Sequence, residues 1–317
     1  MSNLQEFHGL PVFDFPEAGE KAELPAAAAV AWRIAVDGYG DSEDEEWEDA
    51  FKRFVATVDT TAVRALVVGV WKEAYDSGPD SLIAAVAGAG ERFPALRALF
   101  LGDISFDECE ISWINQGHVN PLLDAFPLLE EFGVRGGQAL VFEPVRHERL
   151  RSLTVETGGL GREVVQGIAS SDLPALEHLD LWLGTSEYGA DAGIQEFEPF
   201  FSGVRLPRLT HLALRNSDMQ DVVARSLAGA PVVGRLESLD LSMGTLSDEG
   251  AEALLNGQPL THLKKLNLHH HYLSESMVER IATTLGASGV EVDLSESLFS
   301  EWDRNSDWDN RYVSVGE

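Results

Sequence analysis

Residues 236–255 read LESLDLSMGTLSDEGAEALL, and this stretch contains the pattern that decides the fold. Leu236, Leu239 and Leu241 follow the spacing L-x-x-L-x-L, with polar residues between them. Such alternation is typical of a half-buried β-strand. The second half starts at Ser247, continues with acidic residues and ends in Ala and Leu, which indicates a capped helix. The stretch therefore predicts one strand followed by one helix.

The strand pattern recurs along most of the chain. Weaker copies lie at 63–68 and 292–294, and Ile34 and Val36 are candidates for an earlier strand. Helix-like segments between copies are clearest at 247–255 and 274–285, with shorter ones at 81–89 and 222–228. Units of this kind bury their apolar side only by stacking on neighbours, so we expect parallel, stacked strands. The seven clear copies begin at Leu96, Leu129, Leu150, Leu176, Leu209, Leu236 and Leu263.

The run 236–255 resembles the leucine-rich-repeat family, particularly its ribonuclease-inhibitor-like branch, and the resemblance covers about residues 60–295. The whole chain also resembles bacterial cytoplasmic leucine-rich-repeat proteins of unknown activity. This resemblance implies an α/β solenoid shaped like a horseshoe, with parallel strands on the concave face and helices on the convex face. The family often has Asn or Cys three residues after the third core position. Here that position holds Ile104, Gly137, Gly158, Gly184, Ser217, Gly244 and His271, so we expect no asparagine ladder.

The ends should act as caps, because terminal repeats otherwise expose an apolar face. We predict an acidic N-terminal cap over 1–59, which could include a degenerate first repeat, a solenoid over 60–295 and a C-terminal cap over 296–317. The last cap should contain a closing strand at 312–315. The acidic run 41–49 favours a solvated helix start over a site that recruits a basic partner.

Composition argues against several kinds of partner. The chain has 53 acidic and 23 basic residues and a formal net charge of -30, which repels phosphate backbones and anionic lipids. We therefore expect neither nucleic acid nor membrane as a partner. The N-terminus has no signal-peptide pattern, and the single cysteine, Cys109, agrees with a reducing compartment. These features predict a cytoplasmic protein.

Three local patterns invite chemistry but depart from functional motifs. The acidic run 303–309 has calcium-loop spacing, yet Trp308 stands where the loop needs glycine. The glycine-rich runs at 87–92 and 158–161 lack a complete nucleotide-binding pattern. The histidines at 269–271 alternate between the two faces of a strand, so they converge poorly on one metal ion. We predict no metal, no cofactor and no catalytic residues.

The candidate site follows from strand geometry. If core positions one, four and six face inward, positions three, five and seven face the concave surface. Aromatic and Arg side chains there are common interface anchors. Trp182 is either such an exposed anchor or is covered by the insertion 184–200. The predicted partner-binding residues are His178, Asp180, Trp182, His211, Arg215, Asp240, Asn267 and His269.

Two functions remain from the sequence. The favoured one is a non-enzymatic scaffold that binds a protein or peptide on the concave face. The alternative is a small-molecule-binding or catalytic role built on His178, His211 and Asp180, which requires these groups to share a pocket.

Overall fold

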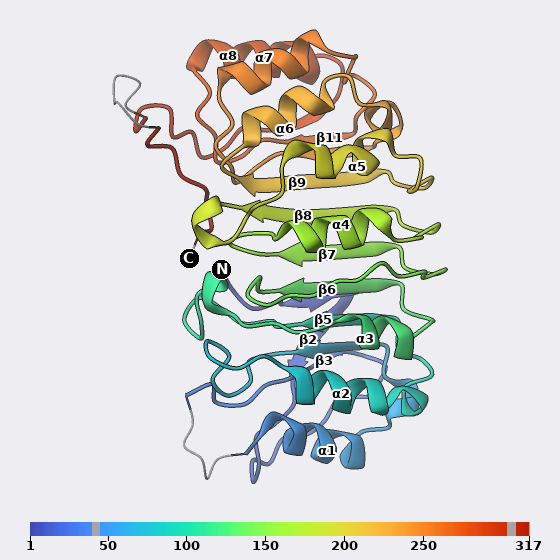
Figure 1. The fold of residues 1–317 in the computed structure, drawn as a ribbon. Coiled ribbons are helices and arrows are strands. Elements are labelled where there is room, and N and C mark those ends of the chain that lie inside the picture. The colour runs from blue at the N-terminus through green and yellow to red at the C-terminus, as the bar shows by residue number, and fades with distance from the viewer. Residues whose placement is uncertain (40–44, 303–308, 317) are drawn as a thin grey trace.

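The computed structural model describes residues 1–39, 45–302 and 309–316, and one twelve-stranded sheet runs through them (Figure 1). Each strand pairs with the next strand in sequence. β1 and β2 are antiparallel, and all later pairs are parallel. The strands are β1 Glu6–Phe7, β2 Leu10–Asp14, β3 Ala31–Ile34, β4 Ala65–Val68, β5 Ala98–Leu101, β6 Glu131–Arg135, β7 Ser152–Glu156, β8 His178–Gly184, β9 His211–Ser217, β10 Ser238–Asp240, β11 Lys265–Asn267 and β12 Glu291–Asp293.

The α-helices of the described residues lie in the connections and cover one face of the sheet (Figure 1). The two clearest sequence-predicted helices, α7 and α8, are confirmed with their caps. The hydroxyl oxygens of Ser247 and Ser274 accept backbone N–H groups of Glu249 and Met277, respectively. The helices are α1 Trp47–Thr57, α2 Asp80–Gly88, α3 Asn120–Ala125, α4 Arg162–Ser170, α5 Glu198–Ser202, α6 Gln220–Leu227, α7 Asp248–Asn256 and α8 Glu275–Ile281.

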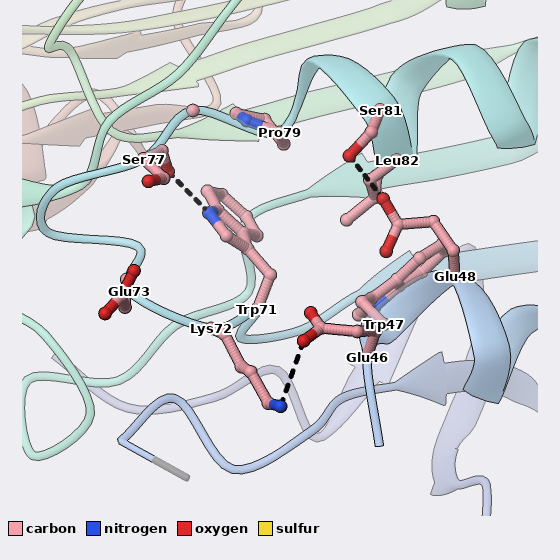
Figure 2. A pocket seen from close by; sticks show the side chains of 11 residues that line it. Glu46, Trp47, Glu48, Trp71, Lys72, Glu73, Ser77, Pro79, Ser81 and Leu82 are labelled. Atoms are coloured by element: carbon pink, nitrogen blue, oxygen red, sulfur yellow. Dashed lines mark hydrogen bonds and ion pairs between the residues drawn. The ribbon is translucent and has the colours of Figure 1, made fainter. Parts of the chain in front are cut away.

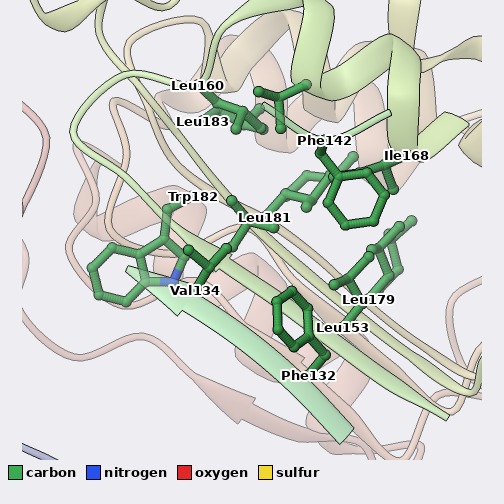
Figure 3. Packing of buried hydrophobic residues seen from close by; sticks show 14 of the residues in the cluster. Phe132, Val134, Phe142, Leu153, Leu160, Ile168, Leu179, Leu181, Trp182 and Leu183 are labelled. Atoms are coloured by element: carbon green, nitrogen blue, oxygen red, sulfur yellow. The ribbon is translucent and has the colours of Figure 1, made fainter. Parts of the chain in front are cut away.

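The register of the strands confirms the alignment of the repeats. Phe132, Leu153 and Leu179, each at the fourth position of its copy, are direct partners across β6, β7 and β8. Figure 3 shows these side chains packed together beneath Phe142 and Ile168. This row of fourth-position side chains is a ladder of large apolar groups, buried on the helix side of the sheet and away from water. It continues through Leu66, Leu99, Leu212, Leu239, Leu266 and Val292.

The sheet begins earlier than the sequence pattern indicates. β1, β2 and β3 all lie within the predicted N-terminal cap, and the candidate strand at Ile34 and Val36 is β3, which ends at Ile34. The start of the acidic run, 41–44, and most of the calcium-like run, 303–308, lie outside the described residues. None of the described helices is long and apolar enough to cross a membrane.

The prediction of a closing strand at 312–315 is wrong, because this segment forms no strand. Its backbone N–H groups donate to different units of the fold and not to one neighbouring strand. Tyr312 donates to the Tyr272 hydroxyl at 2.9 Å, and Ser314 donates to the Met243 carbonyl at 2.8 Å. Val315 then exchanges hydrogen bonds with the side chain of Asn216. The segment therefore crosses the ends of the strands.

Candidate binding face

The N-terminal segment 1–14 covers part of the sheet face that carries no helices, called here the helix-free face. Phe7 packs edge-to-face on Phe100, with ring centres 5.9 Å apart. Leu4, Leu10 and Val12 join the same apolar cluster. Polar contacts hold the segment further along the sheet: Asn3 Nδ2 donates to the Asp103 carbonyl at 2.9 Å, and His8 Nδ1 lies 3.0 Å from Glu131 Oε2. The segment therefore covers the face from β3 to β6.

The sequence analysis predicted an N-terminal cap over 1–59 but did not predict that residues 3–9 reach across the strands as far as β6. A signal for it was present in the sequence. Val67 and Phe100 occupy fifth positions, and Ala65 and Ala98 occupy third positions, where an open face would carry polar residues. All four side chains are buried beneath the N-terminal segment. Apolar residues in outward positions thus marked the strands that another part of the chain covers.

Buried ion pairs lie at the edge of this covered region. Arg135 Nε is 2.7 Å from Glu156 Oε2, and Arg135 Nη1 is 3.4 Å from Asp103 Oδ1. Arg33 Nε lies 3.1 Å from the other carboxylate oxygen of Asp103. Burial raises the pKa of Asp103, whereas the backbone N–H of Leu4 and the two guanidinium groups act to lower it. The N-terminal segment is joined to these pairs by the backbone N–H of Leu4, which donates to Asp103 Oδ1 at 3.0 Å.

Beyond the covered region, two predicted residues form a stacked pair. The rings of His178 on β8 and His211 on β9 are 3.9 Å apart at an angle of 15°. His211 Nδ1 also lies 2.9 Å from Thr210 Oγ1. Burial and the neighbouring His211 lower the pKa of His178. His178 therefore favours its neutral form, in which stacking on the neighbouring ring meets no charge repulsion.

Asp180 and Arg215 form a two-pronged ion pair next to these histidines. Arg215 Nε donates to Asp180 Oδ1 at 2.9 Å, and Nη2 donates to Oδ2 at 2.5 Å. Burial raises the pKa of Asp180 to about 6, although the Arg215 charge and hydrogen bonds act in the opposite direction. The Arg215 guanidinium also lies 5.0 Å from the centre of the Trp182 ring. Both Asp180 oxygens are thus occupied by one neighbour.

Trp182 is not an exposed anchor. Only 7% of its surface is accessible, and its ring lies apart from Phe142 and Ile168 in Figure 3. The neighbouring Arg215 stacks against it, and Trp182 and Arg215 are direct partners across β8 and β9. The ring therefore restricts the conformations of the Arg215 side chain and offers little surface to a partner.

The remaining predicted residues form a polar chain over β10 and β11. Asp240 accepts hydrogen bonds from the Ser242 hydroxyl at 2.5 Å and from Asn267 Nδ2 at 2.8 Å. Asn267 Oδ1 then accepts the backbone N–H of His269 at 3.2 Å. Asp240, Asn267 and His269 each keep part of their surface accessible. The structure thus places seven of the eight predicted residues on the adjoining strands β8 to β11, and His269 lies two residues after the end of β11.

The neighbouring histidines have structural roles. His270 and His271 are buried, and their Nε2 atoms hydrogen-bond to the carbonyls of Tyr312 and Leu294 at 3.1 and 3.0 Å. Burial lowers the pKa of both rings. Across the described ranges, no group of three or more His, Cys, Asp or Glu side chains is arranged to hold a metal ion.

Two hollows open on the helix-free face beside the N-terminal segment. One, of about 390 Å³, lies between residues 4–9 and the sheet and reaches Asp180. The other, of about 310 Å³, is lined by His8, Arg151 and His178. His178 and Asp180 therefore line different hollows, contrary to what the catalytic alternative requires.

A further hollow, of about 350 Å³, lies between the starts of α1 and α2, away from the predicted residues (Figure 2). Its polar groups bond to one another: Lys72 contacts Glu46 at 3.0 Å, and Ser81 donates to Glu48. Trp71 Nε1 donates to the Ser77 carbonyl at 2.9 Å. These contacts stabilise the junction between the two helices.

Comparison with known proteins gives a match among solved structures. A crystal structure of a protein from Bacteroides fragilis has a TM-score of 0.77 and 30% sequence identity to this chain. The match covers 86% of this chain and 74% of the other. No protein-family model and no curated protein matches. The name of the Bacteroides protein states no activity, ligand or partner.

Proposed function

We propose that this chain, which belongs to the same family as the Bacteroides fragilis protein, is a leucine-rich-repeat protein that binds a protein or peptide partner. The binding region is the helix-free face over β7 to β11, the concave face of the proposed horseshoe. One observation carries this proposal. The segment 1–14 covers the face as far as β6, while polar side chains on β8 to β11 stay partly accessible.

The chemistry of this region suits a partner with polar and cationic groups. The accessible side chains are carboxylates, an amide and imidazoles held in place by neighbours, as in the Asp240–Asn267 contact at 2.8 Å. Side chains that are already ordered lose little entropy on binding. The chain's net charge of -30 adds a long-range attraction for a basic partner.

The small-molecule or catalytic alternative has less support. Its one favourable observation is that the hollow of about 310 Å³ reaches His178. Against it, Arg215 holds both oxygens of Asp180, so this carboxylate is poorly placed to act as a base. His178 and His211 stack on each other and do not form an acid–base relay with Asp180.

A capture experiment with matched variants tests the scaffold proposal. The face variant is His178→Ala/His211→Ala/His269→Ala. The control is Arg225→Ala/Glu249→Ala, which removes an exposed pair on the helix side, with its atoms 3.5 Å apart. Circular dichroism checks that both variants fold.

We expect wild type and control to enrich the same partner from host lysate, and the face variant to lose it. Equal capture by all three proteins would reject this face as the binding region. A partner lost with the control alone would move the binding region to the helices.

A further inference from the structure

A cluster of exposed aromatic rings lies on a different part of the molecule, at the carboxyl ends of β3, β4 and β5. Tyr39 follows β3, Tyr75 follows β4, and Phe106 and Trp113 follow β5. These strands end on the left of Figure 1. The four side chains are between 44% and 67% exposed. Large rings gathered in this way, outside a core, are typical of an interaction site. We call these four residues the aromatic patch.

The aromatic patch has an ordered, hollowed shape. Tyr39 and Tyr75 stack with ring centres 5.9 Å apart and an angle of 21° between planes. Together with Phe106, Trp113 and Glu110 they line a hollow of about 360 Å³. Cys109 also lines the hollow and is itself buried. The hollow therefore combines aromatic walls with one carboxylate at its edge.

The surroundings of the aromatic patch are strongly acidic. The described residues of the three connections that carry it, 35–39, 45–46, 69–79 and 102–117, contain nine Asp or Glu residues and one Lys. Four of these acids face a cation: Lys72 contacts Glu46 at 3.0 Å, Arg53 contacts Glu45, and Arg33 contacts Asp103 and Glu108. The other five, Asp37, Glu73, Asp76, Asp107 and Glu110, leave the connections with a net negative charge. Negative potential favours a cationic occupant and opposes a second copy of this chain, whose charge is also -30.

We propose that the aromatic patch binds arginine side chains of a basic, extended peptide segment in a partner protein. A guanidinium group stacks on the electron-rich faces of aromatic rings, and a nearby carboxylate pairs with its N–H groups. Trp113 and the Tyr39–Tyr75 stack supply the rings, and Glu110 supplies the carboxylate. This site is separate from the helix-free face, and its test does not depend on the function proposed there.

Fluorescence anisotropy with the full chain tests the proposal. The probe is a fluorescein-labelled peptide made of six Arg-Gly repeats, and binding is measured in about 150 mM salt. The comparison peptide has citrulline, which is neutral and nearly isosteric, at every Arg. The variants are Tyr75→Ala/Trp113→Ala, Trp113→Phe and the control Val204→Ala, which truncates another exposed apolar side chain.

We expect the Arg peptide to bind wild type and Val204→Ala equally and to bind the double variant about two- to thirty-fold more weakly per ring removed. Trp113→Phe should retain most of the affinity, because a ring remains. Equal binding of the citrulline peptide would overturn the proposal in favour of a purely apolar site. Unchanged binding to the double variant, or absence of binding to wild type, would also overturn it.

Discussion

Replacing Arg135 by leucine tests the role of the buried ion pairs beneath the N-terminal segment. Arg135 is buried, contacts Glu156 at 2.7 Å and donates to the Ile104 carbonyl at 2.8 Å. Arg135→Leu leaves Asp103 and Glu156 buried with one counter-charge fewer. Breaking a buried pair on one side costs about 3–5 kcal/mol. We expect about 3 kcal/mol, because Arg33 still contacts Asp103 at 3.1 Å.

The loss of stability should depend on pH. Burial already raises the pKa of Asp103, and removal of Arg135 raises it further. A group whose pKa is higher in the folded state contributes stability that is present at low pH and is lost as pH rises through the folded pKa. The variant should therefore be closer to wild type near pH 5 than near pH 7.5.

Urea unfolding, followed by circular dichroism at both pH values, measures this effect. Arg135→Leu/Asp103→Asn should recover part of the stability, because the second change removes the uncompensated charge. The control Arg225→Leu breaks an exposed pair with Glu249 and should cost less than about 1 kcal/mol. A loss below about 1 kcal/mol for Arg135→Leu, or an equal loss at both pH values without rescue, would refute the reasoning.

Three further outcomes are expected. Phe7→Ala should speed backbone hydrogen exchange in residues 3–9, because Phe7 anchors that segment to the sheet. The urea midpoint should change little, and unchanged hydrogen exchange would contradict this prediction. Burial and Glu110 raise the pKa of Cys109 to about 11. Iodoacetamide at pH 8 should therefore alkylate Cys109 slowly in the folded protein and faster in urea. Rapid alkylation of the folded protein would contradict this prediction. Acidification from pH 7.5 to 5.5 should remove stability contributed by the buried histidines, since their unfolded forms bind more protons there, whereas Asp180, with its pKa raised to about 6, acts in the opposite direction. Relative to wild type, His178→Gln should therefore make the free energy of unfolding fall less, or rise more, over this range, and an unchanged pH dependence would contradict this. The histidines with a pKa lowered by burial are His147, His178, His270 and His271.

The repeating pattern predicted the arrangement of the sheet closely. Leu179, Leu212 and Leu239 stand at equivalent positions in the sequence and are direct partners in the structure. The caps Ser247 and Ser274 were equally predictable, since each acts on backbone groups within three residues. Such features depend on the spacing of nearby residues, which can be read directly from the sequence.

The candidate site was predictable in its location and less so in its chemistry. Strand alternation placed His178, Asp180 and Asn267 correctly on one face. It did not determine that Asp180 is held by Arg215, or that Trp182 is buried beside it. Those outcomes depend on rotamers and on side chains from neighbouring strands.

For the repeats from β4 to β12, the sequence by itself determined the strand order, the register and the face on which each side chain lies, because these follow from a period of two within strands and from repeat spacing. Only the tertiary structure decided which part of that face stays accessible. The terminal segments cross several repeats, as in the contacts of Asn3 with Asp103 and of Asn216 with Val315. Each joins residues about a hundred positions apart. Outward apolar residues such as Val67 and Phe100 mark strands that are covered, but no local pattern identifies which distant segment covers them.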